Sequence, residues 1–222
     1  LYYSSVDGDQ FPDMLHSRLS AETVGEMTAM LNKGMEYEQY TMPDPSYLNN
    51  VLFVAGYDNT GWDIIVGRPT VWYATNYYYN AEHGFTNVNE FSHGIFDGCY
   101  DYLNSGVGFA NYTAHGSETA WLDPLFSVDD VNNLTNEHKY FLAMGNCCRT
   151  GHWGYNESPC YGEVLTRAAN KGAYAYIGSC PPTTWYNDYY FGVGATTVNT
   201  NLSTGQLGVM PTFEQTTMGS YD

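Results

Sequence analysis

The sequence predicts an α/β domain built on a mostly parallel sheet. Short apolar runs alternate with amphipathic stretches through the middle of the chain, and repeated strand–helix–strand units of this kind form parallel sheets with right-handed crossovers. Aromatic residues make up 17% of the 222 residues and charged residues only 14%, which is typical of a folded domain with a large core. The length suits one domain, or at most two small ones.

Five strands are expected from the apolar runs. The run 51–56, Val-Leu-Phe-Val-Ala-Gly, is continuous and closed by Gly, which indicates a strand buried on both faces. The other strands are expected at 86–91, 108–113, 140–144 and 173–177. From about Thr196 the chain is rich in Thr, Asn and Gly, and we expect loops there with at most one strand.

Helices are expected between these strands and before them. Their ranges are 20–37, 69–82, 98–104, 127–136 and 161–171. Pro69 suits the first turn of a helix, and Ser127 caps a helix whose first turn is acidic. Gly172 ends the last helix, since Gly is common just past a helix terminus.

The charge balance excludes two classes of partner. Seven Lys and Arg residues against 24 Asp and Glu residues give a formal net charge of −17. Binding to nucleic-acid phosphates or to anionic lipids requires cations, so we expect no nucleic-acid partner. No apolar run approaches the roughly 18–20 residues needed to cross a bilayer, so we expect no membrane span.

The cysteines form neither a zinc-binding pattern nor a disulfide framework. They are Cys99, Cys147, Cys148, Cys160 and Cys180, an odd number without paired CxxC spacing. A lone Cys is most often a small buried hydrophobic residue, and we expect this for the three that lie outside the adjacent pair.

Chemically active side chains follow the predicted strands. In an open parallel sheet, ligands and catalytic groups collect beyond the carboxyl ends of the strands. Asp58, His115 and Cys148 follow three of these ends. A thiol beside an imidazole that another group orients is the arrangement of a cysteine nucleophile. Alternation along the strand directs Cys148 into the crevice and Cys147 to the opposite side, against a helix.

Plainer interpretations of the same residues stay open. His115 can be a structural histidine, and Asp58 can cap the turn that follows it. His83 and His93 each precede a Gly in polar, turn-like surroundings, so we expect both in surface loops. Arg149, directly after the candidate nucleophile, either lowers the pKa of the thiol or obstructs the site.

Several segments carry a family resemblance. They are 111–121 (Asn-Tyr-Thr-Ala-His-Gly-Ser-Glu-Thr-Ala-Trp), 140–148 (Tyr-Phe-Leu-Ala-Met-Gly-Asn-Cys-Cys), 162–164 and 172–178. These segments resemble the gingipains, a family of secreted cysteine endopeptidases with a caspase-like fold, and are nearer to its lysine-specific members. The resemblance implies a caspase-like three-layer sandwich in which residues 1–222 form the catalytic subdomain. An upstream subdomain and the downstream end of the catalytic unit are then expected outside this chain.

The resemblance also implies roles for the residues at the strand ends. Cys148 is the expected nucleophile, and His115, 33 residues earlier as in the family, is expected to protonate the leaving amine. Asp58 matches the acid that orients the histidine. The backbone amides of Gly116 and Cys148 are expected to form an oxyanion hole, which stabilises charge that develops only in the tetrahedral state.

A primary specificity pocket follows from the same resemblance. Asp188 matches its anion, Trp185 matches its wall, and Thr113 lies alongside. A buried carboxylate stabilises a Lys ammonium, and an aromatic wall covers the methylene groups of the side chain. The sequence does not set the pocket depth that separates Lys from Arg, and Lys is favoured.

Calcium is expected as a structural ion, and no cofactor is expected for catalysis. Asp7, Asp9, Phe11 and Asp13 place oxygen ligands at alternate positions, which suits a hard cation, although an acidic turn has the same spacing. The matching gingipain segment binds calcium through the carboxylates and the Phe carbonyl, which favours the metal.

A second calcium site is implied at Glu163 and the carbonyl of Trp153. Its remaining carboxylate would lie upstream of the first residue. We therefore expect this site to be weak or empty.

These expectations combine into one function and two alternatives. We expect a secreted or bacterial cell-surface cysteine endopeptidase that cuts protein and peptide substrates after Lys, with the upstream subdomain or a propeptide as a further partner. The first alternative is a catalytically impaired homologue that acts as a surface- or haemoglobin-binding module. The second is a Cys-His transpeptidase, in which an amine replaces water as the acceptor of the acyl group.

Overall fold

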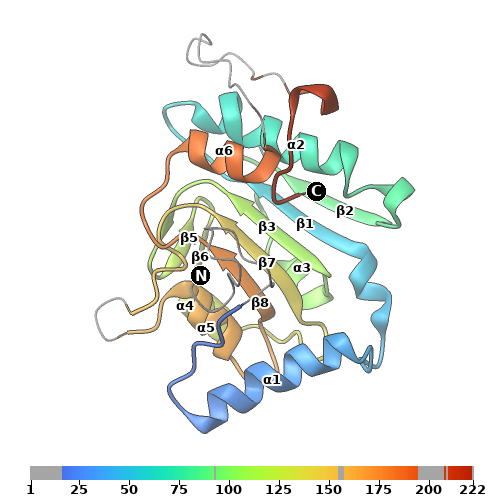
Figure 1. Ribbon diagram of the computed structural model, residues 1–222, viewed down its shortest axis with the longest axis vertical. Helices are drawn as coiled ribbons and strands as arrows, with labels where there is room; N and C mark the ends of the chain where they lie inside the picture. Colours follow the sequence, from blue (N-terminus) through green and yellow to red (C-terminus); the bar gives the residue numbers. More distant parts are fainter. Residues whose placement is uncertain (1–16, 93, 155–157, 195–207, 209, 222) are drawn as a thin grey trace, which may run out of the picture.

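A five-stranded parallel sheet forms the centre of the protein (Figure 1). The computed structural model describes residues 17–92, 94–154, 158–194, 208 and 210–221. The strands are β1 (Asn50–Ala55), β2 (Asn87–Phe91), β3 (Phe109–Thr113), β7 (Phe141–Asn146) and β8 (Ala173–Gly178). Their order is β2-β1-β3-β7-β8, and every neighbouring pair is parallel. The predicted mostly parallel sheet is confirmed, and each predicted strand overlaps an observed one.

Helices cover both faces of this sheet. They are α1 (Val24–Glu38), α2 (Arg68–Tyr77), α3 (Asp101–Ser105), α4 (Val128–Asn132), α5 (Tyr161–Arg167) and α6 (Trp185–Val193). Figure 1 shows α2 and α6 together on one face, with α4 and α5 on the other. Helix α1 packs against α5 and β8. No helix in the described part of the chain is long and apolar enough to cross a membrane.

Both faces of the central strands are buried, because successive side chains of a strand point in opposite directions. In β1, Val51 and Phe53 belong to the core that α2 and α6 cover, whereas Leu52 and Val54 belong to the core that α3, α4 and α5 cover. A slip of one residue in the pairing would exchange the two faces. The apolar pattern therefore specifies the register of the sheet.

The structure contains elements that are absent from the prediction. Three antiparallel strands follow β3, namely β4 (Gly116–Ser117), β5 (Ala120–Leu122) and β6 (Leu125–Ser127). They are two or three residues long, which is too short for a recognisable periodicity. Helix α6 is also unpredicted, although Thr184 and Asn187 form a capping box at its start. Half of the segment after Thr196, where loops and at most one strand are expected, lies outside the described residues.

Several predicted helices end earlier than expected. Helix α2 ends at Tyr77, α4 at Asn132 and α5 at Arg167. After α2, the Asn80 side chain accepts a hydrogen bond from the backbone N–H of Glu82 and starts a separate short turn, η3 (Ala81–His83). Short polar side chains compete in this way with continuation of a helix. The other short helical elements are η1 (Pro45–Asn49), η2 (Asp63–Gly67, a π-helix) and η4 (Phe213–Gln215).

The three lysines bind the carbonyl ends of helices. Lys33 Nζ donates to the carbonyls of Ala168, which caps α5, and Lys171 at 2.8 and 3.0 Å. Lys171 Nζ donates to the last carbonyl of α4, and Lys139 Nζ to the last carbonyl of α3. Cations are favourable at these helix ends, where carbonyl groups lack partners. Burial lowers the pKa of Lys33 to about 7.

Gly56, directly after β1, has no room for a side chain. An added Cβ would lie 1.8 Å from the carbonyl oxygen of Asp123 and 2.6 Å from the Cβ of Ala114. We expect Gly56→Ala to lower the free energy of unfolding by about 1–3 kcal/mol, measured by urea unfolding. Gly34→Ala in α1 is the control, because nothing lies within 4 Å of its added Cβ, and it should gain about 0.5–1 kcal/mol. Equal stability of the two variants would contradict this close packing.

Candidate active site

The pairing of β3 with β7 brings His115 and Cys148 to the same edge of the sheet. Residues paired across these strands are 33 apart, as in the pair of Thr113 with Asn146. His115 and Cys148 are also 33 apart, and each lies two residues beyond its strand. By alternation both follow the strand positions that face α6. The two side chains thus leave neighbouring strands at matching positions.

Gly116 shows how closely the two strand ends approach. A Cβ added to this residue would lie 2.6 Å from Cys147 Sγ and 2.6 Å from the carbonyl oxygen of Cys148. Any other residue here would push the cysteine pair away. The contact supports the predicted proximity of the backbone at Gly116 to Cys148, whereas the oxyanion role of their amides stays a prediction.

Asp58 and His115 form a direct pair. His115 Nε2 lies 2.7 Å from Asp58 Oδ2, which leaves Nδ1 of the imidazole for a second partner. Asp58 is only 6% exposed, whereas the His115 side chain is 47% exposed. The carboxylate follows β1, which pairs with β3, so the same edge of the sheet supplies both groups.

Four donors hold the Asp58 carboxylate. Thr60 donates to Oδ1 from its backbone N–H at 2.6 Å and from its hydroxyl. The Trp185 indole N–H lies 3.2 Å from Oδ2, the oxygen that also binds His115. Burial opposes ionisation of Asp58, but the hydrogen bonds from Thr60 and His115 outweigh it and lower its pKa. Asp58 is therefore a persistent anion beside the imidazole.

The adjacent cysteines have different environments. Cys147 is fully buried in the core that includes Tyr161 and Leu165 of α5, and burial raises the pKa of its thiol far above the ordinary value. Cys148 is half-buried, and its Sγ lies 3.3 Å from the backbone nitrogen and 3.4 Å from the carbonyl oxygen of Thr183. The predicted packing of Cys147 against a helix is confirmed, whereas the direction of Cys148 into the crevice stays a prediction. Cys148 is the thiol of the pair that solvent reaches.

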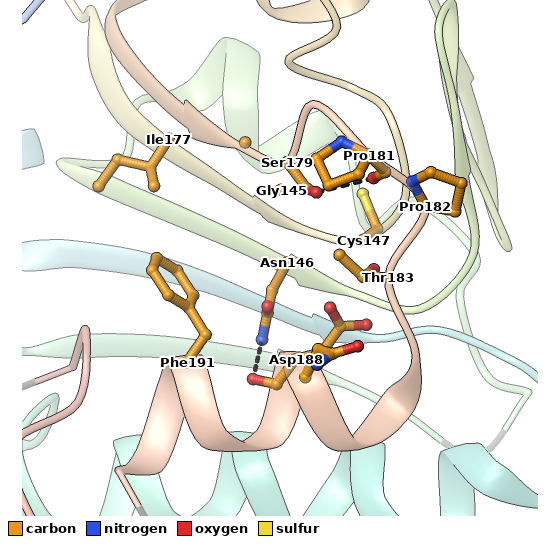
Figure 2. Close-up of a pocket in the computed structure, with 12 residues that line it drawn as sticks. Gly145, Asn146, Cys147, Ile177, Ser179, Pro181, Pro182, Thr183, Asp188 and Phe191 are labelled. Carbon is orange, nitrogen blue, oxygen red and sulfur yellow. Dashed lines mark hydrogen bonds between the residues drawn. The ribbon is translucent and has the colours of Figure 1, made fainter.

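A cavity of about 540 Å³ lies between the ends of β7 and β8 and helix α6, and Cys147 and Thr183 are among the residues that line it. Figure 2 shows Asp188 and Phe191 reaching it from α6 and Ile177 from β8. Asp188 is 5% exposed, and burial raises its pKa to about 7. Thr183 lines the cavity and also contacts Cys148 Sγ, so this residue connects the cavity to the sulfur.

Two residues predicted for the specificity pocket do not line this cavity. Thr113 is fully buried, and its hydroxyl accepts a hydrogen bond from Asn111 Nδ2 at 3.1 Å. Trp185 turns away from Asp188, because its indole N–H binds Asp58 and its ring meets the His115 ring edge-on, with centroids 5.7 Å apart. The expected pocket wall therefore lies against the Asp58–His115 pair.

Arg149 is held at the turn between β4 and β5. Its guanidinium donates to Glu118 Oε1 at 3.0 Å, and the backbone takes a left-handed conformation with a φ of 58°. The Glu118 backbone carbonyl accepts a hydrogen bond from the N–H of Tyr161, which fixes the acidic residue on the body of the domain. The positive charge of Arg149, which directly follows Cys148, is therefore paired with Glu118.

The second predicted calcium site does not fit a cation. The Glu163 carboxylate accepts hydrogen bonds from the Ser20 hydroxyl, from the Cys160 N–H and from Arg167 Nη2, which lies 2.6 Å away. Both oxygens thus have donors, and one donor already carries a positive charge. Trp153, whose carbonyl is the other expected ligand of this site, lies in the loop after the cysteine pair.

The first predicted calcium site, formed by Asp7, Asp9, Phe11 and Asp13, lies outside the described residues. Among the residues that are described, no group of three or more His, Cys, Asp or Glu side chains could hold a metal ion.

The remaining candidates are distributed over core and surface. Cys99 and Cys160 are buried as predicted. The expectation for Cys180 is wrong: it is exposed in the Pro-rich loop after β8, where its Sγ lies 2.8 Å from the carbonyl oxygen of Gly151. His83 is exposed in η3 as expected, and His93 lies outside the described residues.

Sequence reasoning missed three residues that contact the site. They are Thr60 on Asp58, Thr183 on Cys148 and Glu118 on Arg149. A sequence signal exists for Thr60, because an Asp in a turn often accepts a hydrogen bond from the backbone N–H two residues later, as in an Asx-turn. No local pattern indicates the other two contacts, which join segments 31 and 35 residues apart.

Comparisons with known proteins agree with this geometry. The model of Peptidase family C25 matches residues 1–220. Lys-gingipain W83 of Porphyromonas gingivalis is 54% identical over 222 residues, which are 100% of this chain and 12% of that protein. Gingipain R2 of the same species is 27% identical over 176 residues, or 78% of this chain and 24% of its own. The predicted resemblance to the gingipains is confirmed.

Solved structures extend the comparison to the fold. One described as "Structure of Protease" is 54% identical with a TM-score of 0.90, and the match covers 100% of this chain and 47% of that one. The complex of Porphyromonas gingivalis RgpB pro- and mature domains is 25% identical with a TM-score of 0.66, and the match covers 84% and 45%. The predicted caspase-like three-layer sandwich is confirmed. This chain spans about half of each solved chain.

The raised pKa of Asp188 predicts a pH-dependent stability. Asp188 keeps its proton in the folded protein up to about pH 7, whereas the unfolded chain releases it near pH 4. Its contribution to stability therefore falls progressively between about pH 4 and pH 7 and is constant above pH 7. We expect Asp188→Asn to match the wild type near pH 4 and to exceed it by about 2–4 kcal/mol at pH 8 in urea unfolding. Asp129→Asn, at an exposed position of α4, is the control. A constant difference between Asp188→Asn and the wild type across this range would contradict the assignment.

Proposed function

Because this chain belongs to peptidase family C25, we propose that it forms the catalytic part of a secreted cysteine endopeptidase that cuts peptide bonds after Lys. The observation that carries the proposal is the Asp58–His115 pair, with 2.7 Å between Oδ2 and Nε2. The pair lies at the edge of the sheet where Cys148 also leaves its strand. A half-buried thiol, an imidazole and a persistent carboxylate at one edge supply the groups needed for nucleophilic catalysis.

In the proposed mechanism, the Nδ1 side of His115 removes the proton from Cys148. The thiolate sulfur attacks the carbonyl carbon of the scissile bond, and the backbone amides of Gly116 and Cys148 stabilise the oxyanion. The imidazolium then gives its proton to the leaving amine, and an acyl-enzyme forms on sulfur. Water, activated by the same imidazole, hydrolyses this thioester. Asp58 keeps the ring oriented and stabilises its charged form.

Asp188 supports a preference for Lys before the scissile bond. Its carboxyl is buried at the cavity beside Cys148, and its pKa of about 7 reflects the cost of an unpaired charge there. A Lys ammonium in the cavity would pair with the carboxylate and remove that cost. The 54% identity to Lys-gingipain, against 27% to Gingipain R2, supports the same preference.

The partial exposure of Cys148 supports catalysis over a purely binding role. Arg149, which could obstruct the thiol, is paired with Glu118 at 3.0 Å. The chain spans only 12% of Lys-gingipain W83, so secretion, an upstream subdomain and a propeptide partner are parts of the proposal for the whole protein. The relative whose pro- and mature domains form a complex supports the propeptide partner. Calcium at residues 7–13 stays a prediction and has no part in the proposed chemistry.

The proposed nucleophile can be tested by removing the sulfur. We expect Cys148→Ala to abolish hydrolysis of peptides with Lys before the scissile bond, because no other group supplies the attacking atom. Cys147→Ala is the matched control, and it should keep a measurable rate since that thiol is buried and protonated. The intact polypeptide, as it is naturally produced, is the enzyme in this assay. Hydrolysis is measured by the release of a chromogenic amine from the peptide substrate. Equal rates of Cys148→Ala and the wild type would exclude the proposal.

The specificity proposal is tested at Asp188. We expect Asp188→Asn to reduce kcat/KM for Lys peptides about 100-fold, which corresponds to about 2.7 kcal/mol, and to change the rate of Cys148 alkylation by a small uncharged reagent by less than twofold. Asp129→Asn should change neither quantity. Paired peptides that differ only in Lys or Arg report the preference. If both peptides lose rate equally in Asp188→Asn, the pocket assignment is wrong.

A further inference from the structure

Trp185 contacts both Asp58 and His115, the two residues that assist Cys148 in the proposed mechanism. Its indole N–H lies 3.2 Å from Asp58 Oδ2, and His115 Nε2 lies 2.7 Å from the same oxygen. The Trp185 and His115 rings meet nearly at right angles, with an interplanar angle of 79°. One side chain thus fixes the carboxylate by a hydrogen bond and the imidazole by an edge-on ring contact.

The backbone around Trp185 fixes the indole in this position. Trp185 is the first residue of α6, whose start is closed by the capping box of Thr184 and Asn187. On its other side the ring packs on η2, where a Cβ added to Gly67 would lie 3.0 Å from Cζ3. Two residues before Trp185, Thr183 contacts Cys148 Sγ. The segment 183–185 therefore spans from the sulfur to the Asp58–His115 pair.

We propose that Trp185 is a positioning residue, which orients His115 for proton transfer by holding Asp58, in addition to any contact with substrate. This inference rests on the proposed function. Thr60 holds Oδ1 and Trp185 holds Oδ2, so the two donors fix the plane of the carboxylate from opposite sides. When the plane of the carboxylate is fixed, Oδ2 can accept the hydrogen bond from Nε2 in only one orientation of the imidazole. The His115 ring is therefore restrained from rotating about its side-chain bonds.

Removing the indole donor should also change the pH dependence. A hydrogen bond to a carboxylate favours its charged form, so its loss raises the pKa of Asp58. The titratable groups that face Asp58 are His115, Tyr57 and Asp123, which line the same small cavity, and Asp63 of η2. The charges of Asp58 and Asp63 repel each other, which acts in the same direction as the loss of the donor. With one donor fewer, the carboxylate also holds a proton on the hydrogen-bonded Asp58–His115 pair more strongly. The acid limb of the activity profile should therefore move to higher pH when the donor is lost.

The test is Trp185→Phe, which keeps an aromatic ring and removes the N–H. We expect kcat for Lys peptides to fall about tenfold, KM to change by less than twofold, and the acid limb of the kcat profile to move up by at least half a pH unit. Trp72→Phe is the matched control, because the Trp72 indole also donates to a carboxylate, Glu90 Oε1 at 2.8 Å, away from the site. It should leave kcat, KM and the profile unchanged.

Two outcomes would overturn the inference. One is an unchanged kcat and acid limb in Trp185→Phe. The other is a change confined to KM or to the Lys preference, which would make Trp185 a pocket wall only. If Trp185→Phe melts well below Trp72→Phe, replacement of Trp185 by 3-benzothienylalanine preserves the ring size and removes only the donor. The same loss of kcat is then required.

A second readout separates this inference from the proposed function. The rate of Cys148 alkylation by chloroacetamide, followed against pH, depends on the thiol and its imidazole but on no Lys pocket. A shifted alkylation profile in Trp185→Phe supports the positioning role even if the wild type cleaves no Lys peptide, and that failure would count against the proposed function alone. An unshifted profile counts against Trp185 alone.

Discussion

The site depends on the fixed register of three parallel strands. The pairing of β1 with β3 and of β3 with β7 decides which residues leave the sheet side by side. The register is strongly specified because both faces of these strands are buried, and a slip of one residue would turn every core side chain toward the wrong layer. Mispairing would thus disrupt the packing of the whole core, whereas correct pairing brings a few polar groups together at one edge.

Two buried carboxylates at this edge differ in charge state because their donors differ. Asp58 and Asp188 are almost equally inaccessible, at 6% and 5% exposure. Asp58 has donors on both oxygens and a lowered pKa. Among the described residues, Asp188 has only the Thr183 side chain to offset burial, and its pKa rises to about 7. One acid is ionised before any ligand arrives. In the proposed function, the other would become fully ionised at neutral pH when a cation enters the cavity.

The sheet and its edge could be predicted because the signals are local. Continuous apolar runs mark the buried strands, and the residues directly after them must lie at the carboxyl edge. The direction of the Trp185 indole could not be predicted, since it depends on a carboxylate 127 residues earlier. The pairing of Glu163 with Arg167 could have been predicted from the sequence, because oppositely charged residues four apart lie on one side of a helix. The family resemblance favoured a metal there instead.

The lysine contacts at the helix ends have a consequence for a protease of the proposed specificity. Such an enzyme is surrounded by copies of itself, and every accessible lysine on a copy is a possible cleavage point. Lys33 is buried within α1, and the ammonium groups of Lys139 and Lys171 are engaged by α3 and α4. A neighbouring molecule would have to unravel a helix end or a core contact before it could cut. The same contacts that stabilise the fold would thus protect the enzyme from autolysis.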